Sequence, residues 1–99
     1  MFSHPERSAD TYFTVLAVAI RPGEARLGLA IARKQVRRAV DRNRLKRLVR
    51  EAFRKRKAGL EGVDLVVMAR SAAVKADNAQ LSESLARHFA RIGSRIRKT

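Results

Sequence analysis

Residues 26–54 read RLGLAIARKQVRRAVDRNRLKRLVREAFR, a short apolar run followed by a long amphipathic one. In the second half, apolar residues recur at the three- and four-residue spacing of one helix face. They are Leu45, Leu48, Val49, Ala52 and Phe53. The opposite face carries Asn43, Lys46, Arg47, Arg50 and Arg54. The pattern predicts a helix that starts between Arg38 and Asp41, with Asp41 as a candidate N-cap, and that stops near Gly59.

Apolar and β-branched residues on either side of this helix predict strands. Residues 11–20, residues 27–32 and Val63–Ala69 have this composition. Pro and Gly in residues 21–24 favour a turn, so the first two strands are expected to form a hairpin. Residues 1–10 are polar and are interpreted as an irregular lead-in.

A second amphipathic helix is predicted near the end of the chain. Its apolar stripe consists of Leu81, Leu85, Phe89 and Ile92. Asp77 or Asn78 is the expected cap, Gly93 the expected end, and residues 94–99 a loose basic tail. The order strand, strand, helix, strand, helix predicts an α+β fold, a small two-layer α/β sandwich with a mainly antiparallel sheet. Ninety-nine residues correspond to one domain.

Charge is the unusual feature of the composition. The chain has 23 Lys and Arg against nine Asp and Glu, a formal net charge of +14. Residues 33–57 alone contain thirteen basic residues, nine of them Arg, and only two acidic ones, Asp41 and Glu51. Cations stacked on one helix repel each other unless a polyanion approaches, which indicates a nucleic-acid-binding surface.

Arginine predominates in this segment, and guanidinium groups bind phosphates in pairs and stack on unpaired bases. RNA is therefore favoured over two alternatives. A membrane-surface helix would use apolar residues that this small domain needs for its core. A DNA-binding helix at residues 38–57 lacks the preceding short helix and turn.

Several kinds of site are unexpected in this sequence. There is no Cys and there are only two His residues, so no metal site is predicted. No carboxylate pair has a spacing suited to acid–base catalysis, and Glu51 is expected to bridge to a nearby Arg. His88, flanked by Arg87 and Arg91, is expected at the surface. No segment is apolar enough for a signal or a membrane span, so a cytoplasmic protein is expected.

Residues 26–54 resemble the signature of the bacterial ribonuclease P protein component. The resemblance rests on the Gly28 strand, Arg33-Lys34, Ala39-Val40, Arg42-Asn43-Arg44, Lys46-Arg47, Arg50-Glu51 and Phe53, at matching spacing. It implies a left-handed crossover between parallel strands through the Arg-rich helix. It also implies a subunit that binds ribonuclease P RNA and the 5′ leader of precursor tRNA, while the RNA and its Mg2+ ions carry the catalysis. A structural, ribosomal-type RNA-binding protein without a role in cleavage is the alternative.

The resemblance also assigns residues to roles. The RNA-facing set that it implies is Arg33, Lys34, Arg38, Arg42, Asn43, Arg44, Lys46, Arg47, Arg50 and Arg54. The leader-binding candidates are Phe2, Tyr12, Thr14, Leu16 and Arg70. The N-terminal helix of the family, which carries two Phe one turn apart, is expected to be missing here, with Phe2 as a remnant. No catalytic residue and no obligate protein partner are expected.

Overall fold

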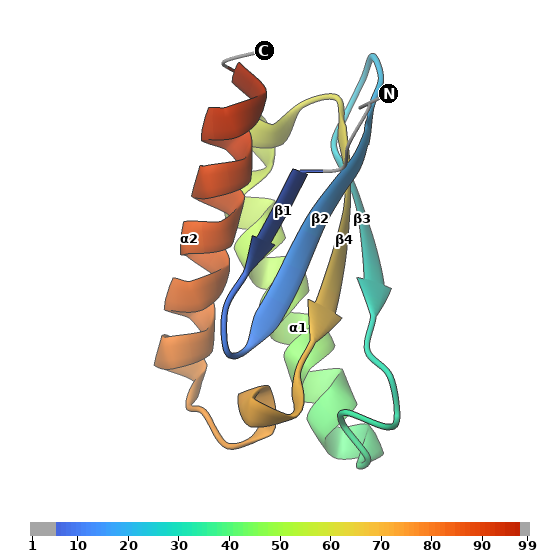
Figure 1. Ribbon diagram of the computed structural model, residues 1–99, viewed down its shortest axis with the longest axis vertical. Coiled ribbons are helices and arrows are strands. Elements are labelled where there is room, and N and C mark those ends of the chain that lie inside the picture. Colours follow the sequence, from blue (N-terminus) through green and yellow to red (C-terminus); the bar gives the residue numbers. More distant parts are fainter. Residues whose placement is uncertain (1–5, 98–99) are drawn as a thin grey trace.

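A four-stranded sheet with two helices packed on one face forms the two layers of the computed structural model, which describes residues 6–97 (Figure 1). The strands are β1 Glu6–Ala9, β2 Phe13–Ile20, β3 Arg26–Ala30 and β4 Val63–Ala69. The helices are α1 Ala39–Arg56 and α2 Asn78–Arg97, with short 3-10 helices η1 Lys57–Leu60 and η2 Ser71–Val74. The predicted α+β two-layer sandwich is confirmed.

The strand order in the sheet is β1-β2-β4-β3. The β1–β2 and β2–β4 pairs are antiparallel, and the β3–β4 pair is parallel. The hairpin predicted between the first two expected strands, which are β2 and β3 here, is therefore wrong, because β4 lies between them. Six of the seven residues of β4 are apolar, and such a strand is stabilised best with a neighbour on both sides.

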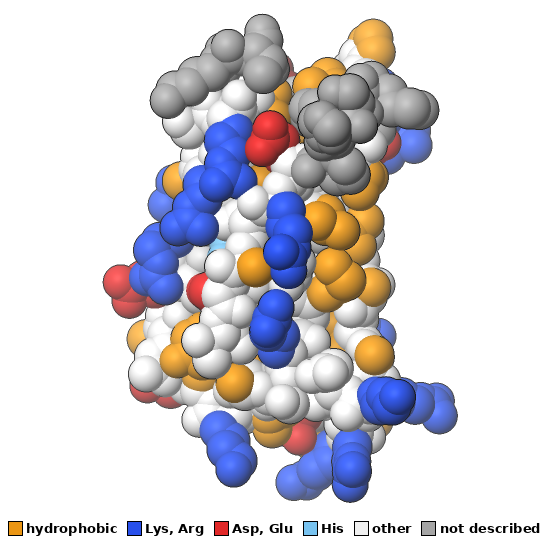
Figure 2. All heavy atoms as spheres, viewed as in Figure 1, with side chains coloured by type: hydrophobic (Ala, Val, Ile, Leu, Met, Phe, Trp, Pro, Cys, Tyr) orange, Lys and Arg blue, Asp and Glu red, His pale blue; other side chains and the backbone are white. Residues whose placement is uncertain are grey.

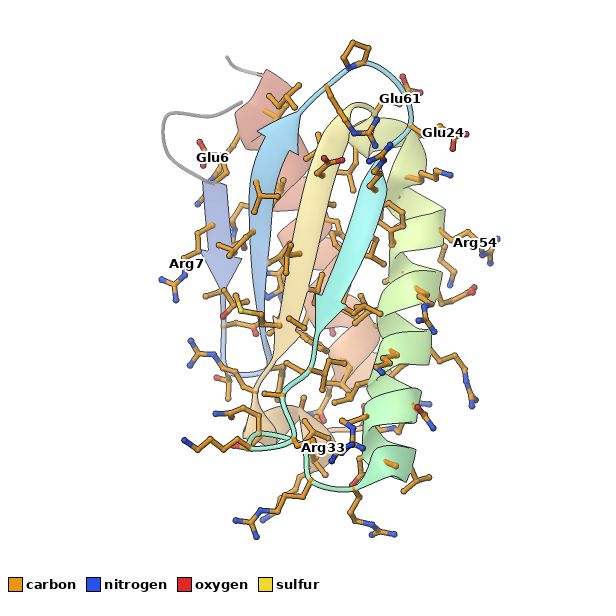
Figure 3. All side chains as sticks on the ribbon, turned by 90° about the vertical axis from the view of Figure 1, so that its right-hand side faces the viewer. Glu6, Arg7, Glu24, Arg33, Arg54 and Glu61 are labelled. Carbon is orange, nitrogen blue, oxygen red and sulfur yellow. The ribbon has the colours of Figure 1, made fainter. Side chains whose placement is uncertain are left out.

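The chain passes from β3 through α1 to the parallel neighbour β4. Figures 1 and 3 show both strands running the same way, and Figure 1 shows α1 behind the sheet, so the connection is left-handed. Most such crossovers are right-handed. The hand implied by the family resemblance is thus the one observed.

Residues 6–9 form a strand, although residues 1–10 had been interpreted as irregular. β1 pairs with β2 over four residues, with Ser8 opposite Val15. The segment ERSA has no apolar alternation that would reveal it, and its position depends on contacts with β2 and α2. Phe2 lies outside the described residues.

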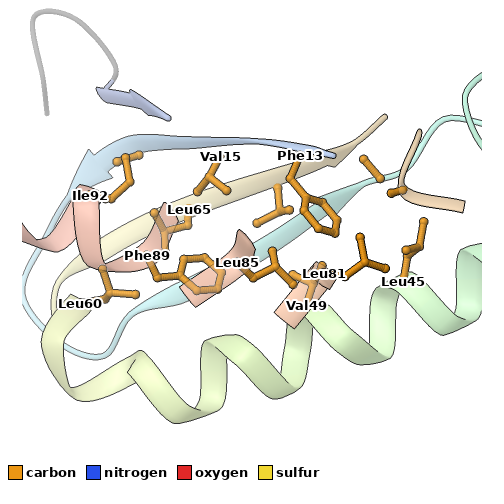
Figure 4. Packing of buried hydrophobic residues seen from close by; sticks show 14 of the residues in the cluster. Phe13, Val15, Leu45, Val49, Leu60, Leu65, Leu81, Leu85, Phe89 and Ile92 are labelled. Atoms are coloured by element: carbon orange, nitrogen blue, oxygen red, sulfur yellow. The ribbon is translucent and has the colours of Figure 1, made fainter. Parts of the chain in front are cut away.

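The core lies between the sheet and the helices (Figure 4). Alternate residues face the helices along β4 and along β2 from Phe13 to Ala17, so both strands contribute every second side chain there to the core. The principal core residues are Phe13, Val15, Leu65, Val67, Leu45, Val49, Leu81, Leu85, Phe89 and Ile92. Phe53, predicted to be in the core, is half-buried and meets Phe89 edge-to-face at a centroid distance of 6.1 Å.

The ends of α1 differ from the prediction. Arg38 is the N-cap residue and makes no side-chain capping bond, while Asp41 lies inside the first turn. At this position its negative charge interacts favourably with the positive end of the helix dipole. The helix gives way to η1 before Gly59, and the chain reverses at Gly62, whose φ is +80°. A Cβ at Gly62 would lie 2.6 Å from the Arg21 carbonyl oxygen, so only glycine fits this turn.

Asp77 caps α2, one of the two predicted possibilities. The Gln80 backbone N–H donates to Oδ1 of Asp77 at 2.8 Å, and the Asp77 N–H donates to Oε1 of Gln80 at 3.1 Å. This reciprocal pair satisfies two N–H groups that the first helical turn leaves without partners. The predicted stop at Gly93 is wrong, because α2 continues to Arg97 and Gly93 is buried within it.

Candidate RNA-binding surface

The outer face of α1 presents a row of polar and cationic side chains, here called the outer strip: Asn43, Lys46, Arg47, Arg50 and Arg54. Together with Glu51 they line a shallow hollow of about 380 Å³. All of the strip is exposed except Lys46, which is half-buried. Figure 3 shows Arg54 projecting from α1 away from the sheet. The structure thus brings together five of the ten residues predicted to face RNA.

Glu51 is paired within the helix, as predicted. Its Oε1 accepts a bond from Nη2 of Arg54 at 2.5 Å, and this hydrogen bond lowers the pKa of Glu51. Within residues 6–97, no acidic side chain forms an ion pair with Lys46, Arg47 or Arg50. The centre of the outer strip therefore keeps its positive charge available for an external anion.

The two arginines of Arg42-Asn43-Arg44 make hydrogen bonds within the protein. Nη1 of Arg42 donates to the carbonyls of Val36 and Arg37, at 3.1 and 2.8 Å, and so fixes the loop that enters α1. Arg44 donates to Oδ1 of Asn78 at 2.9 Å and to the carbonyls of Val74 and Ala76 at 3.4 and 2.6 Å. Both side chains are half-buried, whereas Asn43 between them is exposed.

Arg44 is expected to stabilise the fold. The Arg44→Ala variant loses three bonds that join α1 to residues 74–78, at and just before the start of α2. The expected loss is about 1–3 kcal/mol of unfolding free energy, since hydrogen bonds from a charged donor contribute about 1.5–3 kcal/mol and this site is partly wet. Urea titration measures it. Arg47→Ala, on the exposed strip, is the control and should change stability by less than about 0.5 kcal/mol. Equal stability of Arg44→Ala and Arg47→Ala would contradict the expectation that Arg44 stabilises the fold.

Three more predicted residues lie before or at the start of α1. Arg33, Lys34 and Arg38 are all exposed, the first two in the turn after β3. In Figure 3, Arg33 lies at the end of the molecule opposite Arg54, so cations extend along the length of α1. The loop is held by Oε1 of Gln35, which accepts a bond from the Ser71 N–H at 3.1 Å.

The face of the sheet turned away from the helices is mostly apolar. The leader candidates Thr14 and Leu16 lie on it, opposite Met68 and Val66 of β4, but Thr14 is buried and only Leu16 is partly exposed. Figure 2 shows hydrophobic side chains gathered over this part of the sheet. Met68 and Val66 were not predicted as site residues. Side chains alternate along β4, so with Leu65 buried these two neighbours lie on the face turned away from the helices.

Tyr12 and Arg70, the other described leader candidates, lie at one end of this face. Tyr12 is half-buried against the core, and its carbonyl accepts a bond from the Arg70 N–H at 2.8 Å. The Arg70 side chain is exposed. A groove of about 510 Å³ opens nearby; it is lined by Leu29, Ala30, Ile31, Ala32, Gln35, Met68 and Ala69. An apolar groove beside cations suits a nucleobase attached to a phosphate backbone.

His88 is buried, so its expected surface position is wrong. Its Nδ1 lies 2.6 Å from Oγ of Ser8, and its Nε2 lies 3.1 Å from Oδ2 of Asp10 at an angle poor for a hydrogen bond. Burial lowers the pKa of His88, and the nearby Arg91 and Arg87 lower it further against the opposing effect of Asp10. Position 88 falls on the apolar stripe of α2, three residues after Leu85, a spacing that could have revealed its burial.

Asp10 completes this network between the β1–β2 loop and α2. Partial burial would raise its pKa, but bonds from the Ser84 hydroxyl and the Phe13 and Tyr12 N–H groups outweigh burial and lower the pKa from 3.8 to about 2. The network fastens β1 and its loop to the last helix.

Stability is expected to fall as the pH is lowered, in two stages. The pKa of His88 is lowered on folding, so below about 6.5 the unfolded chain binds a proton that the folded protein disfavours. The pKa of Asp10 is lowered too, so its contribution is present above about 4 and is lost as the pH falls towards 2. Urea unfolding at pH 7.5, 5.5 and 3.5 measures this. His88→Gln should remove the first stage only; an unchanged pH profile in this variant would contradict the assignment.

The described residues add two observations on other kinds of site. Within residues 6–97, no helix has the length and apolar character needed to cross a membrane. In the same part of the chain, no three His, Cys, Asp or Glu side chains gather as a metal-binding group would.

A two-layer sandwich with a cationic helix across one face defines a small nucleic-acid-binding protein of the α+β class. Comparison with known proteins gives the family: the Ribonuclease P profile matches residues 1–93. The chain belongs to the ribonuclease P protein component family.

Relatives and solved structures agree with this assignment. The ribonuclease P protein component of Methylococcus capsulatus is 51% identical over 90% of this chain and 70% of its own length. The ribonuclease P protein component of Thioalkalivibrio sulfidiphilus is 47% identical over 95% of this chain and 78% of its own length. The Thermotoga maritima RNase P protein superimposes with a TM-score of 0.77 at 33% identity, covering 88% of this chain and 83% of its own. For the Staphylococcus aureus RNase P protein the TM-score is 0.76 at 27% identity, covering 89% of this chain and 81% of its own.

Proposed function

We propose that this chain binds the RNA subunit of ribonuclease P through the outer strip and the single-stranded 5′ leader of precursor tRNA across the open sheet face. The observation that carries the proposal is the outer strip itself, in which Lys46, Arg47 and Arg50 have no acidic partner within residues 6–97. Unpaired cations on a rigid helix bind phosphates without first breaking internal ion pairs.

Arg42 and Arg44, two of the ten residues predicted to face RNA, are left out of the proposed RNA contacts. Arg42 and Arg44 hold α1 in position, because their guanidinium groups already donate to carbonyls of the protein. Asn43 has both a donor and an acceptor, and on the exposed face it suits a phosphate or a ribose hydroxyl. Arg33, Lys34 and Arg38 extend the surface beyond the start of α1.

The leader is proposed to cross the sheet over Leu16, Val66 and Met68 towards the groove that Met68 helps to line. Single-stranded RNA exposes base faces that pack on apolar surfaces, and Arg70 at the end of β4 is placed to meet a phosphate.

Cleavage itself is assigned to the RNA subunit. Mg2+ prefers oxygen ligands and is proposed to be held mainly by RNA phosphates, where it can activate water and stabilise the departing oxygen. The protein contributes by neutralising phosphates, so that the two RNAs approach at a lower Mg2+ concentration.

Reconstitution with the cognate RNA tests the proposed function. At low Mg2+, adding the protein should increase both the rate of leader cleavage and the affinity for precursor tRNA. If neither changes, the protein is a structural RNA-binding protein without a role in cleavage.

A separate experiment tests the leader site. Leu16→Ser and Met68→Ser should weaken binding of precursor tRNA by the reconstituted enzyme and leave mature tRNA, which has no leader, unaffected. Equal losses for both tRNAs would place the leader elsewhere.

A further inference from the structure

Val40, in the first turn of α1, is a large apolar residue that the core does not use. Its side chain is 61% exposed, compared with 38% for Val18 and 40% for Ile20, the other exposed large hydrophobic residues among residues 6–97. Single exposed apolar residues are common on protein surfaces, so exposure alone has no functional meaning. The surroundings of Val40 are what distinguish it.

Val40 lies at the head of the outer strip. Asn43 follows it by three residues and Arg47 by seven, spacings that place all three on one side of a helix. Leu45 and Val49, which are buried, face the opposite side. The two residues before the helix, Arg37 and Arg38, are exposed, so cations precede Val40 along the chain, and Arg47 follows it on the same side of the helix.

The residue type is informative at this position. Valine is a weaker helix former than Lys, Arg or Glu, so an exposed valine does not help the helix to form. A valine side chain cannot bind phosphate either. On RNA, the largest apolar surfaces that an aliphatic group can cover are the faces of bases that are not stacked inside a duplex.

We infer that Val40 packs against an unstacked base of the ribonuclease P RNA, at the end of a contact surface whose remaining members bind phosphates. The inference rests on the proposed function and adds a contact that responds to the structure of the RNA rather than to its charge. The cations attract any polyanion, whereas Val40 favours a site where a base is turned out of its helix.

The dependence of affinity on salt distinguishes the two kinds of contact. A phosphate contact releases counterions, so its loss reduces the slope of log K against log salt by about one. Loss of an apolar contact releases none and lowers affinity equally at every salt concentration. Val40→Ala should therefore bind ribonuclease P RNA about five- to fifteenfold more weakly with an unchanged slope, the range for two methyl groups partly or wholly removed from water.

Three further variants complete the experiment, all with ribonuclease P RNA alone. Val40→Thr has nearly the same shape but carries a hydroxyl group, and it should also weaken binding. Val18→Ala makes the same substitution at an exposed valine on the sheet and should bind as the native chain does. Arg47→Ala should lower the slope. Urea unfolding should show that the Val40 variants are folded, because this side chain is exposed.

Each outcome decides one question. Parallel salt plots for Val40→Ala and the native chain, displaced in affinity, support the base contact. Native affinity in Val40→Ala or Val40→Thr, with a reduced slope in Arg47→Ala, overturns the inference and leaves the proposed function in place. Native affinity in Val40→Ala, Val40→Thr and Arg47→Ala means that the outer strip does not bind this RNA. That result overturns both the inference and the proposed function.

Discussion

Replacing Arg47 and Arg50 together with alanine is expected to weaken binding of ribonuclease P RNA about twenty-fivefold at 0.15 M salt. Both side chains are exposed on the outer strip and have no acidic partner within residues 6–97. Two lost phosphate contacts should lower the slope of log K against log salt by about two, and the affinity by about fivefold each at this salt concentration. Filter binding or fluorescence anisotropy at several salt concentrations measures both quantities.

The same helix provides the control. Lys55 and Arg56 are exposed near the end of α1 but do not line the hollow of the outer strip. Their double replacement with alanine removes the same charge from the same helix. If both double variants lose affinity equally, net charge rather than the position of the arginines determines binding.

Leu45→Ala is expected to lower the unfolding free energy by about 2–5 kcal/mol, the range for emptying a fully buried leucine site. Leu45 is completely buried between α1 and the rest of the core. In a domain of this size the whole stability is about 5–15 kcal/mol, so the change should lower the melting temperature by about 10 °C or more.

Leu48 on the same helix is the matched comparison. It is only half-buried at the margin of the core, so Leu48→Ala should cost clearly less. Calorimetry of both variants measures the difference. Equal losses would mean that the apolar stripe, rather than the burial of individual residues, determines the stability of α1.

Local sequence patterns predicted the elements better than their pairing. The bounds of Val63–Ala69 were predicted without error, because a continuous apolar run between turn residues has few other interpretations. The predicted hairpin was wrong because the turn after β2 indicates only that the chain reverses. It does not indicate which strand pairs with β2. That choice depends on β4, more than thirty residues later, and no short window of sequence contains it.

The candidate surface was predicted in part for the same reason. Helical spacing placed Asn43, Arg47 and Arg50 on the outer face, where the structure has them. It did not show that Arg44 reaches the carbonyls before α2, since that contact joins residues thirty or more positions apart. The assignment of these residues to RNA remains a prediction.

The place of β4 in the sheet has a consequence for biosynthesis. Of the four strands in residues 6–97, β4 is the last to leave the ribosome, yet it lies between β2 and β3. Until residue 69 has emerged, β3 has no strand beside it and β2 has only the four-residue β1. Open strand edges attract other chains, so a chain that has emerged only as far as α1 is exposed to aggregation. The interval between the emergence of α1 and the emergence of residue 69 is therefore the one in which we expect this chain to aggregate most readily.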